Sequence, residues 1–186
     1  MASSVTESVG VSEEFPELKG CVPFSLFYSE INLHITWHTK NSAPVITDSI
    51  ETQLYRWLRG RILQAPGVLL LAIGGTDDHV HLAVTVPPTL LVSEWIGELK
   101  GASAHYVNHT LANRKVIEWQ TGYGVVSFGT KAMPWVVRYV ENQREHHAKR
   151  TTYERLEQVE IEKRKPVETG SLEMSGHRRT GRKRPA

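Results

Sequence analysis

The chain has 186 residues, 40% of them hydrophobic, and a formal net charge of only +2. This length and composition are typical of one globular domain with tails, and no apolar run approaches the ~20 residues that a membrane-spanning helix needs. The single cysteine, Cys21, excludes an internal disulfide framework and suits a reducing compartment. The N-terminus lacks the basic and apolar regions of a secretory signal, so we expect a cytoplasmic protein with no membrane association.

Composition divides the chain into three parts. Residues 1–23 are rich in Ser, Glu and Val without a sustained period, which predicts a disordered leader. Residues 24–150 contain the strongly patterned segments and form the predicted folded domain. Residues 151–186 are charged and end in a basic run, which predicts a largely disordered tail. Such a tail either holds phosphates nonspecifically or serves only solubility.

Residues 30–40 form the clearest strand, because apolar and polar residues alternate along the whole segment. One face is the predicted core face, made of Ile31, Leu33, Ile35 and Trp37. The other face carries His34, His38 and Lys40, which predicts an antiparallel sheet with one open face. A helix follows, with Asp48 as the expected N-cap and apolar residues at helical spacing as far as Ile62.

Two apolar runs, 68–73 and 82–86, flank a Gly-Gly-Thr-Asp-Asp segment that has the composition of a hairpin turn. His79 and His81 begin the second strand and, being two residues apart, share a face opposite to Val80 and Leu82. Two imidazoles on one strand face are a candidate pair of metal ligands. A lone His-x-His pair is more often simply polar, so the rest of the sequence has to decide between these interpretations.

The second half of the predicted domain contains a helix, a strand and another helix. The first helix starts near Ser93, and Gly101 in its interior suggests close approach of another backbone or a ligand. Residues 119–124 are aromatic and Gly-rich and lead into a short strand over 125–128. Pro134 suits the first turn of the last helix. That helix carries Tyr139 and Gln143, which are four residues apart and therefore on one face.

The element order is β-α-β-β-α-β followed by a helix. This order predicts an α+β fold of the split βαβ, ferredoxin-like or RRM-like type. In this fold a four-stranded antiparallel sheet has two crossover helices on one face.

These segments together resemble the HUH single-tyrosine transposases of the insertion sequence 200/605 type, most closely their REP-associated branch. The resemblance spans about residues 24–150. It is carried by the residues Asp78-His79-Val80-His81 and by four further segments: residues 34–41 (HITWHTKN), 99–103 (LKGAS), 119–124 (WQTGYG) and 137–147 (VRYVENQREHH).

The resemblance implies a role for each matched residue. Tyr139 matches the nucleophile, His79 and His81 match two metal ligands, and Gln143 matches the third. It implies a homodimer that cleaves single-stranded DNA next to hairpins and transfers the strand through a 5′-phosphotyrosine link. The tyrosine helix of one subunit can complete the site of its partner in this family.

The chemistry of the residues agrees with these roles. A phenol with a pKa near 10 is a poor nucleophile at neutral pH, and a divalent metal on the scissile phosphate offsets the developing charge. Mg²⁺ prefers oxygen ligands, so a His-His-Gln set fits Mg²⁺ or, better, Mn²⁺. Zn²⁺ would favour a hydrolase with an activated water, and no third His or Cys stands at ligand spacing.

Several other residues are candidates for contact with DNA. Lys100, Arg138 and the arginines of the first helix are candidate phosphate ligands, and Trp119 and Tyr123 are candidate base-stacking residues. For both aromatic residues, core packing is an equal alternative. His34, His38 and Lys40 complete the expected DNA-binding set.

Two other functions compete with strand transfer. One is a non-catalytic module that holds single-stranded nucleic acid on an RRM-like sheet. Such modules use aromatic residues on the open face, whereas Trp37 falls on the core face here, which disfavours this function. The other is a metal-dependent phosphodiesterase that uses the same histidines without a covalent tyrosyl intermediate.

Overall fold

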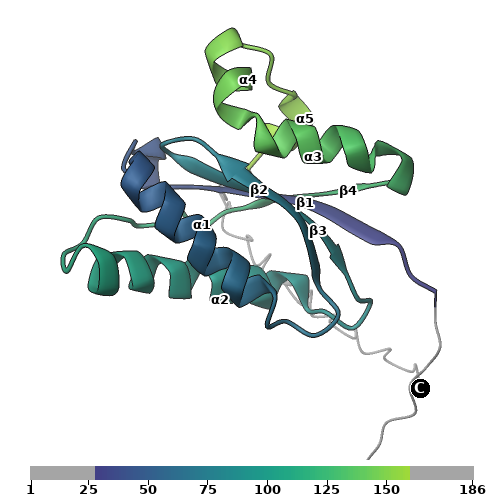
Figure 1. Ribbon diagram of the computed structural model, residues 1–186, viewed down its shortest axis with the longest axis horizontal. Coiled ribbons are helices and arrows are strands. Elements are labelled where there is room, and N and C mark those ends of the chain that lie inside the picture. Colours follow the sequence, from purple (N-terminus) through teal and green to yellow (C-terminus); the bar gives the residue numbers. More distant parts are fainter. Residues whose placement is uncertain (1–27, 160–186) are drawn as a thin grey trace, which may run out of the picture.

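The computed structural model describes residues 28–159, which fold into one four-stranded antiparallel sheet with helices on both faces (Figure 1). The strands are β1 (Ile31–His38), β2 (Leu69–Gly75), β3 (His79–Val86) and β4 (Gly124–Phe128). The longer helices are α1 (Asp48–Ile62), α2 (Val92–His105), α3 (Met133–Glu141) and α4 (Gln143–Lys149). Short helical segments are Lys40–Ser42, the π-helix Tyr106–Leu111, Thr130–Ala132 and α5 (Glu154–Glu157).

The sheet has the strand order β2-β3-β1-β4, which confirms the predicted ferredoxin-like split βαβ fold. The register places Thr36 of β1 opposite His81 of β3, and His38 opposite His79. The first-strand histidines therefore lie beside the hairpin histidines on one face.

The opposite face forms the main core with α1 and α2. Alternation along β1 and β3 directs every second side chain to this face, as the sequence predicts. Ile35, Trp37, Val80 and Leu82 are fully buried there. The helices contribute Leu54, Leu58, Ile62, Ile96 and Leu99 to the same core.

The histidine-bearing face is not open, which corrects the expectation from the sequence. Figure 1 shows α3 and α4 on the side of the sheet opposite α1 and α2. Val136 and Val140 of α3 pack on Ala72 of β2 and Ala83 of β3. Small side chains on the strands allow this close approach, and the polar residues between the two layers become buried.

Three local details differ from the sequence-based prediction. The N-cap positions are Thr47 and Leu91, one residue before Asp48 and two before Ser93. The space around Gly101 is open, so no backbone approaches it. The last helix is not continuous, because Asn142 leaves helical geometry (φ −107°, ψ 27°) and separates α3 from α4.

The segment 151–159 folds back over β1 and β4, although the sequence assigned it to the tail. Gly124 makes this possible, because a β-carbon there would lie 2.2 Å from the carbonyl oxygen of Gln158. The remainder of the predicted tail and the predicted leader 1–23 lie outside the described residues, and the three-part division stays a prediction. Within residues 28–159 no helix is both long and apolar enough to cross a membrane.

Gly74 sets how closely α3 approaches the sheet. A β-carbon on Gly74 would lie 1.9 Å from the carbonyl oxygen of Val140, which is far inside van der Waals contact. Helix α3 can therefore dock at its observed depth only above a glycine.

We predict that Gly74→Ala lowers the free energy of unfolding by about 1–3 kcal/mol, because overpacking displaces α3 from β2. Thermal or denaturant unfolding followed by circular dichroism measures this change. The control is Gly60→Ala, because a β-carbon at Gly60 meets nothing within 4 Å. Alanine in the interior of α1 should leave stability unchanged or raise it by about 0.5–1 kcal/mol. An unfolding midpoint for Gly74→Ala equal to that of the wild type would contradict the role of this glycine.

Candidate active site between the sheet and helix α3

His79 and His81 are buried, and one nitrogen of each ring is held in place. The Nδ1 atom of His79 lies 2.6 Å from Asp78 Oδ1 and 2.9 Å from Thr76 Oγ1. The Nδ1 atom of His81 lies 2.8 Å from Nε2 of His34. Such contacts fix the ring orientation and leave the second nitrogen available as a ligand. Neither Nε2 atom has a hydrogen-bond partner among residues 28–159.

Helices α3 and α4 bring Tyr139 and Gln143 to the same place. The ring of Tyr139 lies 6.3 Å from that of His81, centroid to centroid. The side-chain Nε2 of Gln143 donates to the carbonyl oxygen of Tyr139 at 3.0 Å, across the break between the two helices. Its Oε1 is buried and has no hydrogen-bond partner in the described part of the chain. The structure thus links the four residues that the sequence singled out through neighbouring contacts: His79 with His81, His81 with Tyr139, and Tyr139 with Gln143.

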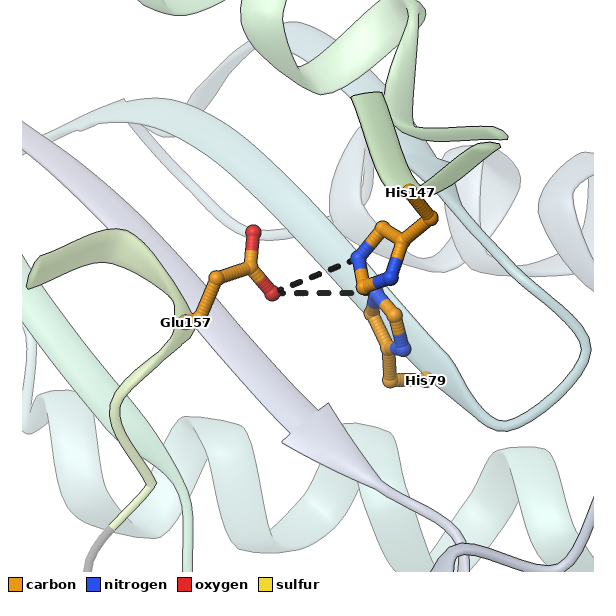
Figure 2. Close-up of side chains that lie close together, drawn as sticks. All are labelled: His79, His147 and Glu157. Carbon is orange, nitrogen blue, oxygen red and sulfur yellow. Dashed lines mark ion pairs between the residues drawn. The ribbon is translucent and has the colours of Figure 1, made fainter. Parts of the chain in front are cut away.

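Two further residues of this site, His147 and Glu157, were not predicted. Figure 2 shows His147 and His79 directed toward the carboxylate of Glu157. The Oε2 atom of Glu157 lies 3.5 Å from Nε2 of His81, 3.6 Å from that of His147 and 3.9 Å from that of His79. The other carboxylate oxygen, Oε1, accepts a hydrogen bond from the hydroxyl of Tyr139.

The reason that these two residues escaped prediction differs between them. His147 lies four residues after Gln143, so helical spacing alone could have placed it beside the site. Its ligand atom lies within 4.8 Å of those of His79 and Glu157, so the expectation that no third histidine stands at ligand spacing was wrong. Glu157 lies in a short helix in a charged region without an apolar stripe, and nothing in its sequence context distinguishes it from its acidic neighbours.

The pKa values of the site follow from burial and from these contacts. Burial lowers the pKa of His81 to about 4, and burial together with the neighbouring His81 lowers that of His34 to about 3. Both rings are therefore neutral at pH 7, which is the form that binds metals. Burial opposes ionisation of Glu157, but its contacts with His81 and Tyr139 prevail and lower its pKa to about 2.

Tyr139 is the protonated partner in this arrangement. Burial and the hydrogen bond to Glu157 raise the pKa of its phenol to about 12. The hydroxyl also accepts a hydrogen bond from the backbone N–H of Tyr153 at 2.9 Å. At neutral pH the site therefore holds a neutral phenol hydrogen-bonded to an ionised carboxylate.

The residues present fit a divalent metal ion. Buried polar atoms without partners are rare in folded proteins, and here the neighbouring rings of His79 and His81 each have one, Nε2, as does Gln143, whose Oε1 is unpartnered. Ligand atoms of His79, His147 and Glu157 also lie within 4.8 Å of one another.

Two of the residues predicted to bind DNA serve the histidine cluster instead. His34 is fully buried and orients His81, so it is not accessible to DNA. His38 is partly buried, with its ring centroid 4.8 Å from that of His79. Both expectations came from treating the histidine face of the sheet as open.

Lys100, Trp119 and Tyr123 meet in a groove of about 490 Å³ beside α2. The Lys100 ammonium donates to the carbonyl oxygens of Thr121 (3.1 Å) and Gly122 (2.8 Å), so it supports the loop over 119–124. Burial lowers the pKa of Lys100 to about 8. The Trp119 indole donates to Ser103 at 3.0 Å, which leaves the ring half-buried.

The two remaining candidates for DNA contact lie apart from this arrangement. Lys40 is exposed and forms an ion pair with Glu118. Arg138 is exposed on α3 and lines a pocket next to Tyr139.

Comparison with known proteins agrees with this geometry. Residues 27–143, more than half of the chain, match the family described as "Transposase IS200 like". The ISDra2 transposase TnpA of Deinococcus radiodurans is 24% identical over 119 residues, which make up 61% of this chain and 84% of that protein.

Two solved structures share the fold. A crystal structure assigned to a transposase of Deinococcus radiodurans R1 has 25% identity and a TM-score of 0.50, over 63% of this chain and 93% of that one. A REP-associated tyrosine transposase bound to a REP hairpin has 18% identity and a TM-score of 0.50, over 65% of this chain and 71% of that one.

The chain belongs to the IS200-like transposase family, and it is therefore an enzyme that cleaves DNA in transposition. The matched stretch ends at Gln143, so His147 and Glu157 lie beyond it.

Proposed function

We propose that this transposase cleaves single-stranded DNA at hairpin-forming sequences and transfers the strand through a 5′-phosphotyrosine intermediate. The observation that carries this proposal is the placement of the Tyr139 hydroxyl against buried histidines that are held in a ligand-ready orientation. A phenol that only stabilised the fold would not need neighbours, here His81 and Gln143, that each keep a buried polar atom without a partner.

The covalent step uses groups of this chain. The Tyr139 oxygen attacks the scissile phosphorus, a bond from phosphorus to the phenolic oxygen forms, and the bond to the 3′-oxygen of the DNA breaks. Glu157 already accepts a hydrogen bond from that hydroxyl, and it takes up the phenolic proton as the bond to phosphorus forms, because bond formation makes the phenolic oxygen strongly acidic. The 3′-oxygen takes up a proton from water and leaves as a free 3′-hydroxyl. The phosphodiester energy is conserved in the phosphotyrosine, so the reverse attack rejoins strands.

His79, His81 and Gln143 would hold the divalent ion, with His147 and Glu157 within reach. Such an ion supplies positive charge to the scissile phosphate and to the leaving oxygen. The imidazole-rich set favours Mn²⁺ over Mg²⁺, which prefers oxygen ligands. Asp78 and His34 fix the rings, and the pKa of Asp78 is lowered to about 2 because its hydrogen bonds to His79 and Thr76 outweigh burial.

We infer hairpin DNA as the substrate from two features. One of the structural neighbours is a transposase bound to a REP hairpin, and this chain shares its fold. The groove at Trp119 and Tyr123 also presents aromatic rings on which unpaired bases can stack. Assignment to the REP-associated branch and the homodimer stay predictions.

The competing RRM-like binding module is disfavoured by the packing of α3. RRM modules bind nucleic acid on the exposed sheet face, and here that face is covered by α3, with His34 and His81 fully buried. The phosphodiesterase alternative shares the histidines but does not require the Tyr139 hydroxyl, so the two mechanisms can be separated by substitution.

We predict that Tyr139→Phe abolishes the covalent adduct and strand transfer while hairpin binding persists. The substitution removes only the hydroxyl, and the lost hydrogen bonds cost about 1–3 kcal/mol of stability. The assay incubates end-labelled single-stranded hairpins from the neighbouring genome with the protein and Mn²⁺, then detects adducts that survive SDS.

Tyr106→Phe is the matched control, because Tyr106 lies at the end of α2, where its ring stacks on Trp57. It should form adducts at the wild-type rate. A Tyr139→Phe variant that still forms the adduct would place the nucleophile elsewhere, and one that cuts without an adduct would support the phosphodiesterase mechanism.

Metal binding is tested separately from cleavage. We predict that His81→Ala weakens Mn²⁺ binding by tenfold or more, measured by isothermal titration after dialysis against a chelator, because a buried ligand is lost. His105→Ala, on the exposed surface of α2, should bind as the wild type does. Equal Mn²⁺ affinity of the wild type, His81→Ala and His105→Ala would rule out a metal site at His79 and His81.

A further inference from the structure

A cluster of aromatic side chains lies on the outer side of the proposed nucleophile. The Trp135 ring stacks on Tyr139, with centroids 5.5 Å apart and an interplanar angle of 19°. Tyr153 meets Trp135 edge-on, 5.4 Å away at 82°. Trp135 is 45% exposed and Tyr153 is 48% exposed, so both present aromatic surface to solvent.

Trp135 is not needed to hold α3 on the sheet. That contact uses Val136 and Val140, and Trp135 belongs to neither of the two hydrophobic clusters found in residues 28–159. The stacked pair Trp57 and Tyr106 differs, because both of its rings pack against the main core. Core packing therefore does not explain why an exposed indole stacks on the proposed nucleophile, and binding of a ligand does.

The rings of Trp135 and Tyr139 border a pocket of about 440 Å³ between α3 and α4. Its lining carries two permanent cations, Arg138 and Lys149, and one acidic residue, Glu145, which pairs with Lys149. Arg138 is exposed and forms no ion pair within the described residues. An aromatic wall beside an unpaired arginine is the combination that binds a nucleobase and its phosphate.

We propose that this pocket binds the nucleotide on the 3′ side of the cut, with its base stacked on Trp135 and its backbone contacted by Arg138. The inference rests on the proposed function. After the displacement the nucleotide on the 3′ side of the cut is joined through its 5′-phosphate to the Tyr139 oxygen. It is therefore held next to Tyr139, where the pocket lies.

The test measures binding without cleavage. The probe is a 5′-phosphorylated tetranucleotide with 2-aminopurine at its first position and three thymidines after it, which mimics the 5′ end of the cut strand. Stacking on an aromatic ring quenches 2-aminopurine fluorescence. Wild type should quench the probe saturably, and Trp135→Ala should lose the quenching and bind at least about tenfold more weakly, as expected for one lost stacking contact.

Matched variants separate a nucleotide site from a structural effect. Trp135→Phe keeps an aromatic face and should retain most of the quenching. Arg138→Gln removes the proposed phosphate contact, so this variant should bind phosphorylated and unphosphorylated probes with equal affinity. Trp57→Ala removes the other stacked indole and should quench the probe as the wild type does. Equal binding by Trp135→Ala and wild type would overturn the proposal, and so would a loss of binding in Trp57→Ala as large as that in Trp135→Ala.

The outcome is independent of the covalent assay. If no protein forms an adduct but only Trp135→Ala loses the probe, the nucleotide site stands and the phosphotyrosine mechanism fails. If wild type and Trp135→Ala form the adduct equally and neither binds the probe, the mechanism stands and this site fails. A Trp135→Ala variant that sediments as a monomer where wild type is a dimer, with no probe bound by either, would identify Trp135 as a subunit contact and overturn the proposal.

Discussion

The close packing of α3 on the histidine-bearing face of the sheet is the constraint on which the site depends. It requires small side chains at Ala72 and Ala83 and no side chain at Gly74, where the carbonyl oxygen of Val140 comes within 1.9 Å of the position of a β-carbon. This packing buries the histidines, keeps His81 neutral and sets Tyr139 beside it. The burial of the histidines, the protonation state of His81 and the position of Tyr139 thus have one structural cause.

The polar groups enclosed by this packing form two layers. The outer groups, Asp78, Thr76 and His34, satisfy one nitrogen each of His79 and His81, the proposed metal ligands. The inner atoms are left without partners, which is costly unless something binds there. Glu157 approaches these atoms at 3.5–3.9 Å and connects them to the Tyr139 hydroxyl. The ionised carboxylate therefore links the proposed metal ligands to the proposed nucleophile.

The sequence predicted the sheet well because two-residue periodicity in β1 and β3 is a local signal. It placed His79 and His81 on one face and Val80 and Leu82 on the other, as the structure confirms. It did not predict the covered face, because the contact of α3 with β2 joins segments about 65 residues apart through residues as plain as alanine and glycine. The expectation that His34 would meet DNA was wrong for that reason. Glu157 escaped prediction because its position depends on the chain crossing over Gly124, which no local pattern encodes.

In the described structure one chain supplies both Tyr139 and the histidines of the site. The most direct measurement mixes Tyr139→Phe with His81→Ala under conditions that allow subunits to exchange, and then assays the covalent adduct on single-stranded hairpin DNA. If each site is built within one chain, every site in the mixture lacks either the nucleophile or a ligand, and the mixture stays inactive. Recovery of a substantial fraction of wild-type adduct formation would show that the tyrosine helix acts on the partner's histidines, and would contradict the account.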